Sequence, residues 1–370
     1  MDVKKILHVG VGRCGNNFVN LMMSKDSRYS GYMINTAILD MEDLKNFKRA
    51  GHYLIPHSQG SGRNRDFAFE YAKNNISAMA DEFSDYRHFK VFPVYFSTDG
   101  GTGSGATPAV VRAIKRMIPN AKIIAIGVFP PLYTTIEALR NTLDCWDDLM
   151  KLRDAKLIDG FMFIDNARRE TIEEINRIAI SQLDKYFKAD TFSTAGILDK
   201  EDSAKIICKS SNYHAVLELN PDIKDFKKCL ANAIKESVFL MPGTFECDYV
   251  GCLTNNGWVK QIDIRGTFTP FKDCLVGASY KDLNDEMSVG ENILVSSGLS
   301  IPVFRIEELR EQLSVLENNE KSRDYDASLY VNRKKKENDN KSIEVSIKAK
   351  VTSRMTASDL DDLFDDDFWG

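Results

Sequence analysis

The sequence lacks long apolar runs and a strong excess of either charge. No stretch of about 18 consecutive apolar residues occurs, so we expect no membrane-spanning helix and no membrane partner. The apolar run 6–11 is too short for a secretory signal peptide. The formal net charge of −5 gives no general case for direct nucleic-acid binding. The expected location is therefore the cytoplasm.

The cysteines and histidines lack the spacing of metal ligands. Seven cysteines are scattered along the chain, and no two of them form a Cys-x-x-Cys pair. An odd number of cysteines without such pairs argues against a zinc site and a disulfide framework. The five histidines show no ligand spacing either. We expect reduced thiols and no metal site made by these residues.

The lysine of the Walker-type phosphate loop is also missing. Residues 99–105 read Asp-Gly-Gly-Thr-Gly-Ser-Gly, and no lysine follows the glycines. This segment lies between an apolar run at 91–96, typical of a buried strand, and a helical pattern at 106–117. Glycines at a strand-to-helix turn let backbone N–H groups and the helix dipole bind an anion. The segment predicts a phosphate-binding loop, with hydroxyl donors from Thr102 and Ser104.

The first part of the chain alternates between strand and helix patterns. Apolar runs predict strands at 6–11, 32–39, 91–96, 123–129 and 161–164. Helices are expected to follow the first strand and to occupy 66–80, 106–117 and 135–152. This alternation predicts an α/β fold with a doubly wound, mostly parallel sheet, in a nucleotide-binding domain at residues 1–169.

A long central helix is expected at 170–187, because Ile172, Ile175, Ala179 and Leu183 recur at helical spacing. It would lead into a second, smaller α/β domain at 188–318. The expected elements of that domain are strands at 213–219, 249–253, 274–279 and 293–296 and a closing helix at 306–316. The charged tail 319–370 carries basic residues at 333–336 and an acidic, aromatic segment at 359–370. This composition predicts partial disorder and a docking role.

The first strand is followed by a second glycine motif that favours a different function. Gly10, Gly12 and Gly15 fit the pattern G-x-G-x-x-G, and Asp40 follows the second strand where a ribose-binding acid would stand. Alone, this motif indicates an NAD-dependent Rossmann oxidoreductase. That hypothesis leaves the glycine-rich loops at 60–62 and 100–105 unexplained, whereas three such loops could surround one polyphosphate. Both hypotheses remain open at this point.

The ordered motifs together resemble the tubulin/FtsZ superfamily. Its signature is G-G-G-T-G-[ST]-G, and here Asp99 stands in place of the first glycine. The resemblance implies a tubulin/FtsZ-like fold that binds GTP or GDP with Mg²⁺ and hydrolyses GTP. It assigns nucleotide contacts to four loops, ribose contacts to a pair on a helix, and guanine contacts to two asparagines. In that order these residues are Gly12, Arg13, Cys14, Gly15, Asn16, Asn35, Gly60, Gly62, Asn64, Gly100, Gly101, Thr102, Gly103, Ser104 and Gly105; Glu137 and Arg140; and Asn166 and Asn176.

A pair of acids follows the long helix. The superfamily has a loop N-x-D-x-x-D here, which enters the nucleotide site of the next subunit; this chain keeps Asp199 and Asp202 but has Ile197 for the asparagine. The resemblance implies that these acids position a water for hydrolysis and that subunits assemble head to tail into filaments. Read locally, the same acids could instead cap a helix.

Within the superfamily the chain looks most like the TubZ-type tubulins of plasmids and phages. Those build filaments that segregate DNA, and their tail engages a DNA-bound adaptor. A phage spindle-type tubulin, whose acidic tail docks on a neighbouring subunit, is an alternative. A filament protein that binds nucleotide but hydrolyses it poorly is another, because Asp99 and Ile197 depart from the family pattern.

Overall fold

The described part of the chain is built around one mixed sheet of eleven strands. The computed structural model describes residues 2–56, 60–188, 195–196, 199–220, 222–223, 225–254, 263–278 and 292–336. The sheet order is β3-β2-β1-β4-β5-β6-β8-β11-β9-β10-β7. Contacts group Met1–Glu317 into one compact unit and Asn318–Gly370 into another. Both domains expected before the tail therefore share the first unit.

The first six strands in this order are parallel and form the doubly wound half of the sheet. They are β1 (Leu7–Val11), β2 (Ser30–Asn35), β3 (Gly51–Leu54), β4 (Val91–Ser97), β5 (Lys122–Phe129) and β6 (Gly160–Asp165). All but β3 are almost wholly buried, as expected where helices cover both faces of a parallel sheet. The α/β fold class predicted from the sequence is confirmed.

The other half of the sheet mixes parallel and antiparallel pairs. Its strands are β7 (Ala195–Gly196), β8 (Tyr213–Glu218), β9 (Glu246–Thr254), β10 (Thr269–Ala278) and β11 (Ile293–Leu299). The halves meet where β6 pairs with β8 through Phe161 and Tyr213 alone. The hydroxyl of Tyr213 supports this junction, because it donates to the Leu240 carbonyl at 2.6 Å and accepts from the Phe163 amide at 3.1 Å.

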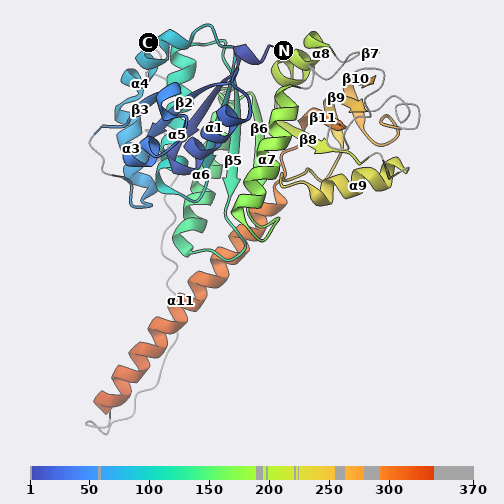
Figure 1. Cartoon of the computed structure of the whole chain (residues 1–370). Coiled ribbons are helices and arrows are strands. Elements are labelled where there is room, and N and C mark those ends of the chain that lie inside the picture. Colours follow the sequence, from blue (N-terminus) through green and yellow to red (C-terminus); the bar gives the residue numbers. More distant parts are fainter. Residues whose placement is uncertain are drawn as a thin grey trace. The chain divides into compact units, whose positions relative to one another are not determined.

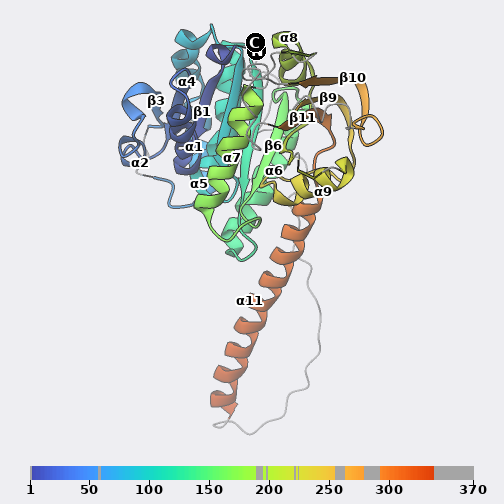
Figure 2. The ribbon, with the colours of Figure 1, turned by 45° about the vertical axis from the view of Figure 1, so that its right-hand side comes forward.

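Helices cover both faces of the sheet (Figures 1 and 2). Buried side chains of α1 (Gly12–Lys25) and α7 (Ile172–Phe187) share one core with one face. The core on the other face includes side chains of α3 (Arg65–Asn74), α4 (Ile76–Glu82), α5 (Gly101–Met117), α6 (Ile136–Asp154), α9 (Phe226–Glu236) and the first turns of α11 (Phe304–Lys336). The short helices α2 (Leu39–Glu42) and α8 (Lys200–Ala204) lie between longer elements in the chain.

Several element boundaries differ from those expected. The helix predicted at 66–80 is two helices, α3 and α4, separated at Asn75. Helix α5 begins at Gly101, inside the predicted phosphate loop, rather than at 106. The closing helix α11 continues to Lys336. Strand β2 ends at Asn35, because the chain then turns into α2.

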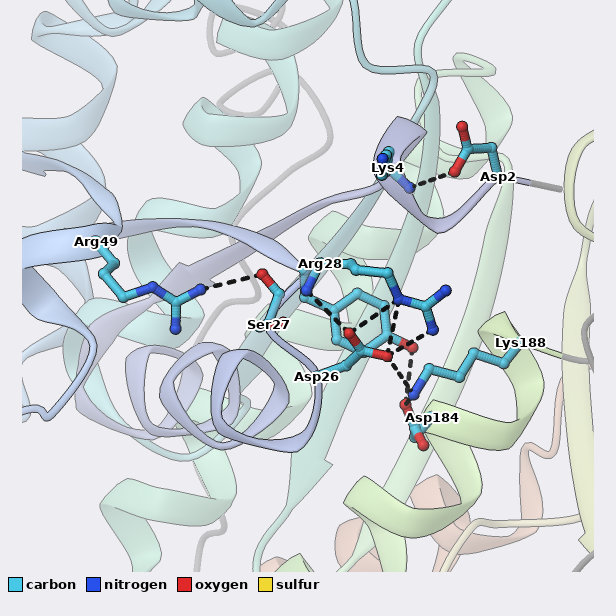
Figure 3. A network of polar contacts seen from close by, with 9 residues as sticks. Asp2, Lys4, Asp26, Ser27, Arg28, Arg49, Asp184 and Lys188 are labelled. Atoms are coloured by element: carbon cyan, nitrogen blue, oxygen red, sulfur yellow. Dashed lines mark hydrogen bonds and ion pairs between the residues drawn. The ribbon is translucent and has the colours of Figure 1, made fainter.

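Charged side chains, of which Asp184 and Lys188 are buried, join the loop after α1 to the end of α7 (Figure 3). The Lys188 ammonium lies 2.8 Å from an Asp26 carboxylate oxygen and 2.6 Å from one of Asp184. The Tyr29 hydroxyl donates to Asp184 at 2.9 Å. Hydrogen bonds from Arg28, and then from Lys188, hold the pKa of Asp26 well below its usual range. These contacts tie the end of α7 to the loop after α1.

Candidate nucleotide-binding site

A pocket of ≈ 630 Å³ opens at the carboxyl ends of the parallel strands. Its lining includes the last residues of three strands, which are Val11 of β1, Asn35 of β2 and Ser97 of β4. It also includes Val128, the last residue but one of β5. β1 and β4 are neighbours, and the strand order runs away from them in opposite directions. Open α/β sheets bind ligands at such a switch point. The volume is in the range of small-molecule sites.

Twelve of the predicted nucleotide contacts line this one pocket. They are Gly12, Arg13, Cys14, Asn35, Gly60, Gly62, Gly100, Gly101, Thr102, Gly103, Asn166 and Asn176. They come from segments as far apart in sequence as α1 and α7, and the fold brings them together. The lining also includes residues outside the predicted set: Val11, Asn17, Phe18, Thr36, Asp40, Ser61, Arg63, Ser97, Asp99, Val128 and Ile172.

Two helix N-termini meet at the glycine-rich loops. Helix α1 begins at Gly12 and α5 at Gly101. Gly12 has φ +72°, and a Cβ there would lie 2.9 Å from the Gly103 nitrogen. A Cβ at Gly103 would lie 2.9 Å from the Ser97 oxygen. The two backbones therefore touch, and both helix dipoles favour an anion at this end.

Not every predicted glycine faces the pocket. Gly15 and Gly105 do not line it, because each packs against protein backbone. A Cβ at Gly15 would lie 2.0 Å from the Tyr95 oxygen, and one at Gly105 would lie 2.4 Å from the Arg65 oxygen. The structure therefore gives these two glycines a packing role and does not bring them to the site.

Three predicted polar contacts are also engaged elsewhere. Asn16 is fully buried, and its amide bonds the backbone N–H and carbonyl of Ile34, both at 3.2 Å. Asn64 caps α3 by accepting from the Phe67 amide at 3.0 Å. The Ser104 hydroxyl donates to the Gly100 carbonyl. None of the three lines the pocket, so their bonds hold the loops in shape.

The loop at 60–63 is held in a left-handed conformation. Gly60, Gly62 and Arg63 have φ of +96°, +56° and +67°. A positive φ is uncommon for a residue with a Cβ. The Asn141 amide fixes this backbone by donating to the Arg63 carbonyl at 3.1 Å. The sequence motif identified the glycines, but nothing in it singled out Arg63.

Hydroxyl groups join three strand-end loops. The Thr36 and Thr102 hydroxyls lie 2.7 Å apart, and Thr102 donates to the Ser61 hydroxyl at 3.2 Å. Thr36 and Ser61 were missed as site residues. Their signal was positional: Thr36 directly follows β2, and Ser61 stands between two glycines.

The pocket lining contains two arginines and two carboxylates. Arg13 and Arg63 are exposed, and neither makes a described ion pair within the ranges the structure covers. The Asp99 carboxylate accepts from the Ser97 hydroxyl, and that of Asp40 accepts from the Asn35 amide at 3.3 Å. Burial, and secondly the Asp99 charge, raise the pKa of the Cys14 thiol to about 12. Cys14 is therefore a neutral wall residue at physiological pH.

The wall formed by α1 and α7 has amide and apolar groups. Asn176 and Ile172 stand one turn apart on α7, opposite Asn17 and Phe18 of α1 in the lining. The Asn166 side-chain oxygen is buried and has no hydrogen-bond partner among the described residues. Such an acceptor is costly unless something else satisfies it. Phe18 and Ile172 were missed because apolar residues at helical spacing predict core.

The predicted ribose pair is not in the pocket. Glu137 and Arg140 are exposed on α6 and are absent from the lining. Arg140 bonds Glu317, with its Nη2 2.8 Å from a carboxylate oxygen. The structure therefore supplies no ribose contact from these two side chains.

The acids Asp199 and Asp202 also lie outside the pocket lining. They form a capping box at the start of α8: the Asp199 carboxylate accepts from the Asp202 amide at 3.0 Å, and that of Asp202 accepts from the Asp199 amide at 3.3 Å. The Lys205 ammonium is 2.7 Å from the other Asp202 oxygen. The helix-cap expectation is thus met locally. Ile197 lies outside the described residues.

The described ranges contain neither a metal-ligand cluster nor a membrane-spanning helix. No group of three or more His, Cys, Asp or Glu side chains there could hold a metal ion. No described helix combines the length and the apolar composition needed to cross a membrane.

Comparisons with known proteins identify the class. Residues 5–172 match the profile of the Tubulin/FtsZ family, GTPase domain. The chain is 28% identical over 303 residues to the tubulin-like protein TubZ of Clostridium botulinum C phage, covering 80% of this chain and 79% of that protein. It is 28% identical over 177 residues to the tubulin-like protein CetZ of Pyrococcus abyssi, covering 46% and 47%. The match to this family model lies in the N-terminal half of the chain, where the predicted motifs also lie.

Solved structures extend the likeness of the fold beyond this domain. The crystal structure of Clostridium botulinum phage c-st TubZ superposes with a TM-score of 0.74, at 23% identity, and covers 86% of this chain and 100% of that one. A GTPγS-form protofilament of Bacillus thuringiensis TubZ superposes with a TM-score of 0.68, at 17% identity, covering 86% and 94%. At these identities the comparison shows a shared fold: the chain has the architecture of TubZ.

Proposed function

We propose that this chain binds GTP with Mg²⁺, hydrolyses it, and assembles head to tail into filaments in which one subunit completes the site of the next. The observation that carries the proposal is that the acid pair does not line the same pocket as the glycine-rich loops. The phosphate loops lie in one pocket, while Asp199 and Asp202 lie outside its lining. Carboxylates from a second copy would then complete the site, as in the tubulin/FtsZ family.

The phosphates would lie at the N-termini of α1 and α5. Backbone N–H groups of Gly12 and of 101–103 lie at these helix starts, and the hydroxyl of Thr102 adds a donor. Arg13 and Arg63 supply positive charge in place of the absent lysine. The nearby carboxylates, Asp40 and Asp99, would repel a polyphosphate by themselves. Mg²⁺ offsets such charge and is usually bound through phosphates, waters and one or two carboxylates, so the donor set fits a Mg²⁺–nucleotide complex.

The base would bind between α1 and α7. The buried, unpartnered oxygen of Asn166 can accept from the N1–H or N2 amine of guanine. The Asn176 amide adds donors for O6, and Phe18 and Ile172 provide apolar contact. An unpartnered acceptor in the pocket supports guanine, which presents N1–H and the N2 amine side by side, whereas adenine has only its N6 amine as a donor on that edge.

Hydrolysis would depend on Asp199 and Asp202 of one subunit acting in the nucleotide site of the adjacent subunit. Two carboxylates beside a γ-phosphate can orient and polarise the attacking water. In the isolated chain both are held by the capping box, and Asp202 also by Lys205. We therefore expect weak turnover by separate subunits and faster turnover on assembly.

GTP turnover measured against protein concentration, with light scattering in the same cuvette, tests the proposal. A shared threshold and joint rise of both signals is expected. Turnover strictly proportional to protein, without scattering, would refute the split site. Scattering without phosphate release would favour a filament that hydrolyses poorly. Protection of the fold by NAD(H) but not by GTP would favour the oxidoreductase.

Conservative variants test the acids themselves. Asp199→Asn and Asp202→Asn keep an oxygen for the capping bonds but remove the charge, so they should assemble with GTP and hydrolyse at least 100-fold more slowly, within the range of general-base effects. Glu201→Gln is the matched control, since Glu201 is exposed in the same turn. Normal hydrolysis by both Asp variants would refute their role.

The tail has a separate proposed role, in binding a DNA-bound adaptor during DNA segregation. Residues 337–370 lie outside the described residues, so the acidic segment carries no structural argument. Deletion of 319–370 should keep GTP hydrolysis and lose adaptor binding. Loss of assembly instead would favour the spindle-type alternative, in which the tail docks on a neighbouring subunit.

A further inference from the structure

Arg305, the second residue of α11, is buried beside two strand ends that border the pocket. Its side chain is 3% exposed, and its Nε lies 3.5 Å from an Asp165 carboxylate oxygen. One terminal nitrogen donates to the Pro130 carbonyl at 3.3 Å, and the other to Glu308 at 3.0 Å. A single guanidinium thus joins the end of β6, the loop after β5 and the first turn of α11.

Asp165 in turn shapes the residues that follow β6. One of its carboxylate oxygens accepts from the Ala167 amide at 3.0 Å, and its carbonyl accepts from the Arg168 amide at 3.1 Å. Burial raises the pKa of Asp165. The positive charge of the neighbouring Arg305 acts in the opposite direction and so favours the ionised carboxylate. The ionised form is the better acceptor for the turn.

Asn166 is the second residue of this turn, which spans 165–168. Its backbone amide donates to the Phe129 carbonyl at 3.3 Å, while its buried side-chain oxygen has no described partner and borders the pocket. The direction of this oxygen depends on the turn, and the turn is closed by Asp165. Arg305 itself does not line the pocket.

We infer that Arg305 is a positioning residue for base selection: through Asp165 it fixes the turn at 165–168, and so aims the Asn166 acceptor at the donors of a guanine ring. The inference rests on the proposed binding of guanine nucleotide. Helix α11 thereby takes part in nucleotide selectivity without touching the nucleotide. A merely structural Arg305 would stabilise the fold and leave the choice of base unchanged.

Competition binding on the full chain tests this inference, with fluorescent GTP as probe and GTP, ITP and ATP as competitors. ITP lacks the N2 amine, and ATP also lacks the N1–H. The parent should bind GTP more tightly than either. Arg305→Met should weaken GTP by about five- to tenfold, roughly one hydrogen bond, and weaken ATP less, because adenine lacks both donors. Arg310→Met is the control, because Arg310 is exposed on the same helix and pairs with Asp147.

Arg305→Met leaves the Asp165 charge buried without its partner, so this variant could lose stability as well. The double variant Asp165→Asn with Arg305→Met removes both charges, which proteins often tolerate. It should regain the parent's melting temperature but keep the weakened preference for GTP, because the link that Arg305 makes from the turn to Pro130 and α11 is lost.

Three outcomes would overturn the inference, and only one of them would also overturn the proposed guanine site. A folded single or double variant with the parent's full preference for GTP over ATP refutes the positioning role alone. A parent that binds GTP, ITP and ATP equally refutes the proposed guanine site, and the inference with it. Equal weakening of all three nucleotides by Arg305→Met, reversed in the double variant, would make Arg305 merely structural.

Discussion

The signature glycines should separate into two groups when each is changed to alanine. At Gly103 an added Cβ would lie 2.9 and 3.0 Å from the backbone oxygen and nitrogen of Ser97 and 3.3 Å from the Val11 oxygen. These atoms belong to the adjacent strands β4 and β1, in the middle of the sheet, and cannot rotate away. At Gly100 the nearest atom is the Ser97 hydroxyl oxygen at 3.5 Å, an ordinary contact.

The expected magnitudes follow from these distances. Overpacking of a closely packed interior costs about 1–3 kcal/mol, and we place Gly103→Ala at the upper end because all three neighbours are backbone atoms. That lowers the melting temperature by about 5 °C or more in a protein of this size. Gly100 has φ −84° and ψ 160°, which alanine adopts freely. Gly100→Ala should therefore change stability by less than about 1 kcal/mol.

Thermal melts by circular dichroism, with and without GTP, check both predictions. A ligand at 100 times its Kd stabilises the native state by about 2.7 kcal/mol. Gly103→Ala should melt early even without GTP. Gly100→Ala should melt like the parent without GTP but lose much of the GTP-induced rise, because its Cβ enters the pocket lining. Equal melting of the parent and Gly103→Ala, or early melting of Gly100→Ala, would refute this division.

Three further predictions concern the interior. Burial lowers the pKa of His8 to about 3 and that of His214 to about 4. As the pH falls, these histidines therefore bind protons first in the unfolded state. The free energy of unfolding should decrease below about pH 6.5, by about 2 kcal/mol per histidine at pH 5. Denaturant midpoints at pH 7 and pH 5 measure this loss, which His8→Phe should roughly halve. Cys14, with its raised pKa, should resist iodoacetamide at pH 8 in native protein, as mass spectrometry of the labelled peptides would reveal. Lys188→Met leaves the buried Asp184 carboxylate without its ion pair, while Asp26 keeps Arg28, and should cost about 3 kcal/mol in chemical unfolding, against little for the exposed Lys209→Met.

The fold was predictable where short-range patterns decide it. The apolar runs at 6–11, 91–96 and 123–129 correspond to β1, β4 and β5 within a residue or two. Their near-continuous apolar character follows from burial on both faces of a parallel sheet. The start of α5 was misplaced, because four glycines oppose a helix by propensity. Close packing of these glycines on β1, β4 and the loop before α3 compensates for that preference.

The site was predictable as a set of loops but not residue by residue. A glycine motif does not reveal which neighbour requires the missing side chain. At Gly15 and Gly105 that neighbour is protein backbone, whereas Gly100 and Gly62 border the pocket. The pairing of Arg140 with Glu317 joins residues 177 positions apart, so no local pattern could indicate it. Phe18 and Ile172 resemble core residues until the fold places them at the pocket.

The order of the pocket-lining residues along the chain has a consequence for biosynthesis. Asn176 is the last residue of the lining, and Arg305 comes 129 residues later (305 − 176). At about 5–20 residues per second, a ribosome needs roughly 6–26 s to reach it. A nascent chain can thus hold every pocket-lining residue before the second half of the sheet exists. If Arg305 orients the Asn166 oxygen, a ribosome-bound chain that lacks α11 would bind nucleotides with little preference for one base. The preference for guanine would then be acquired late in translation.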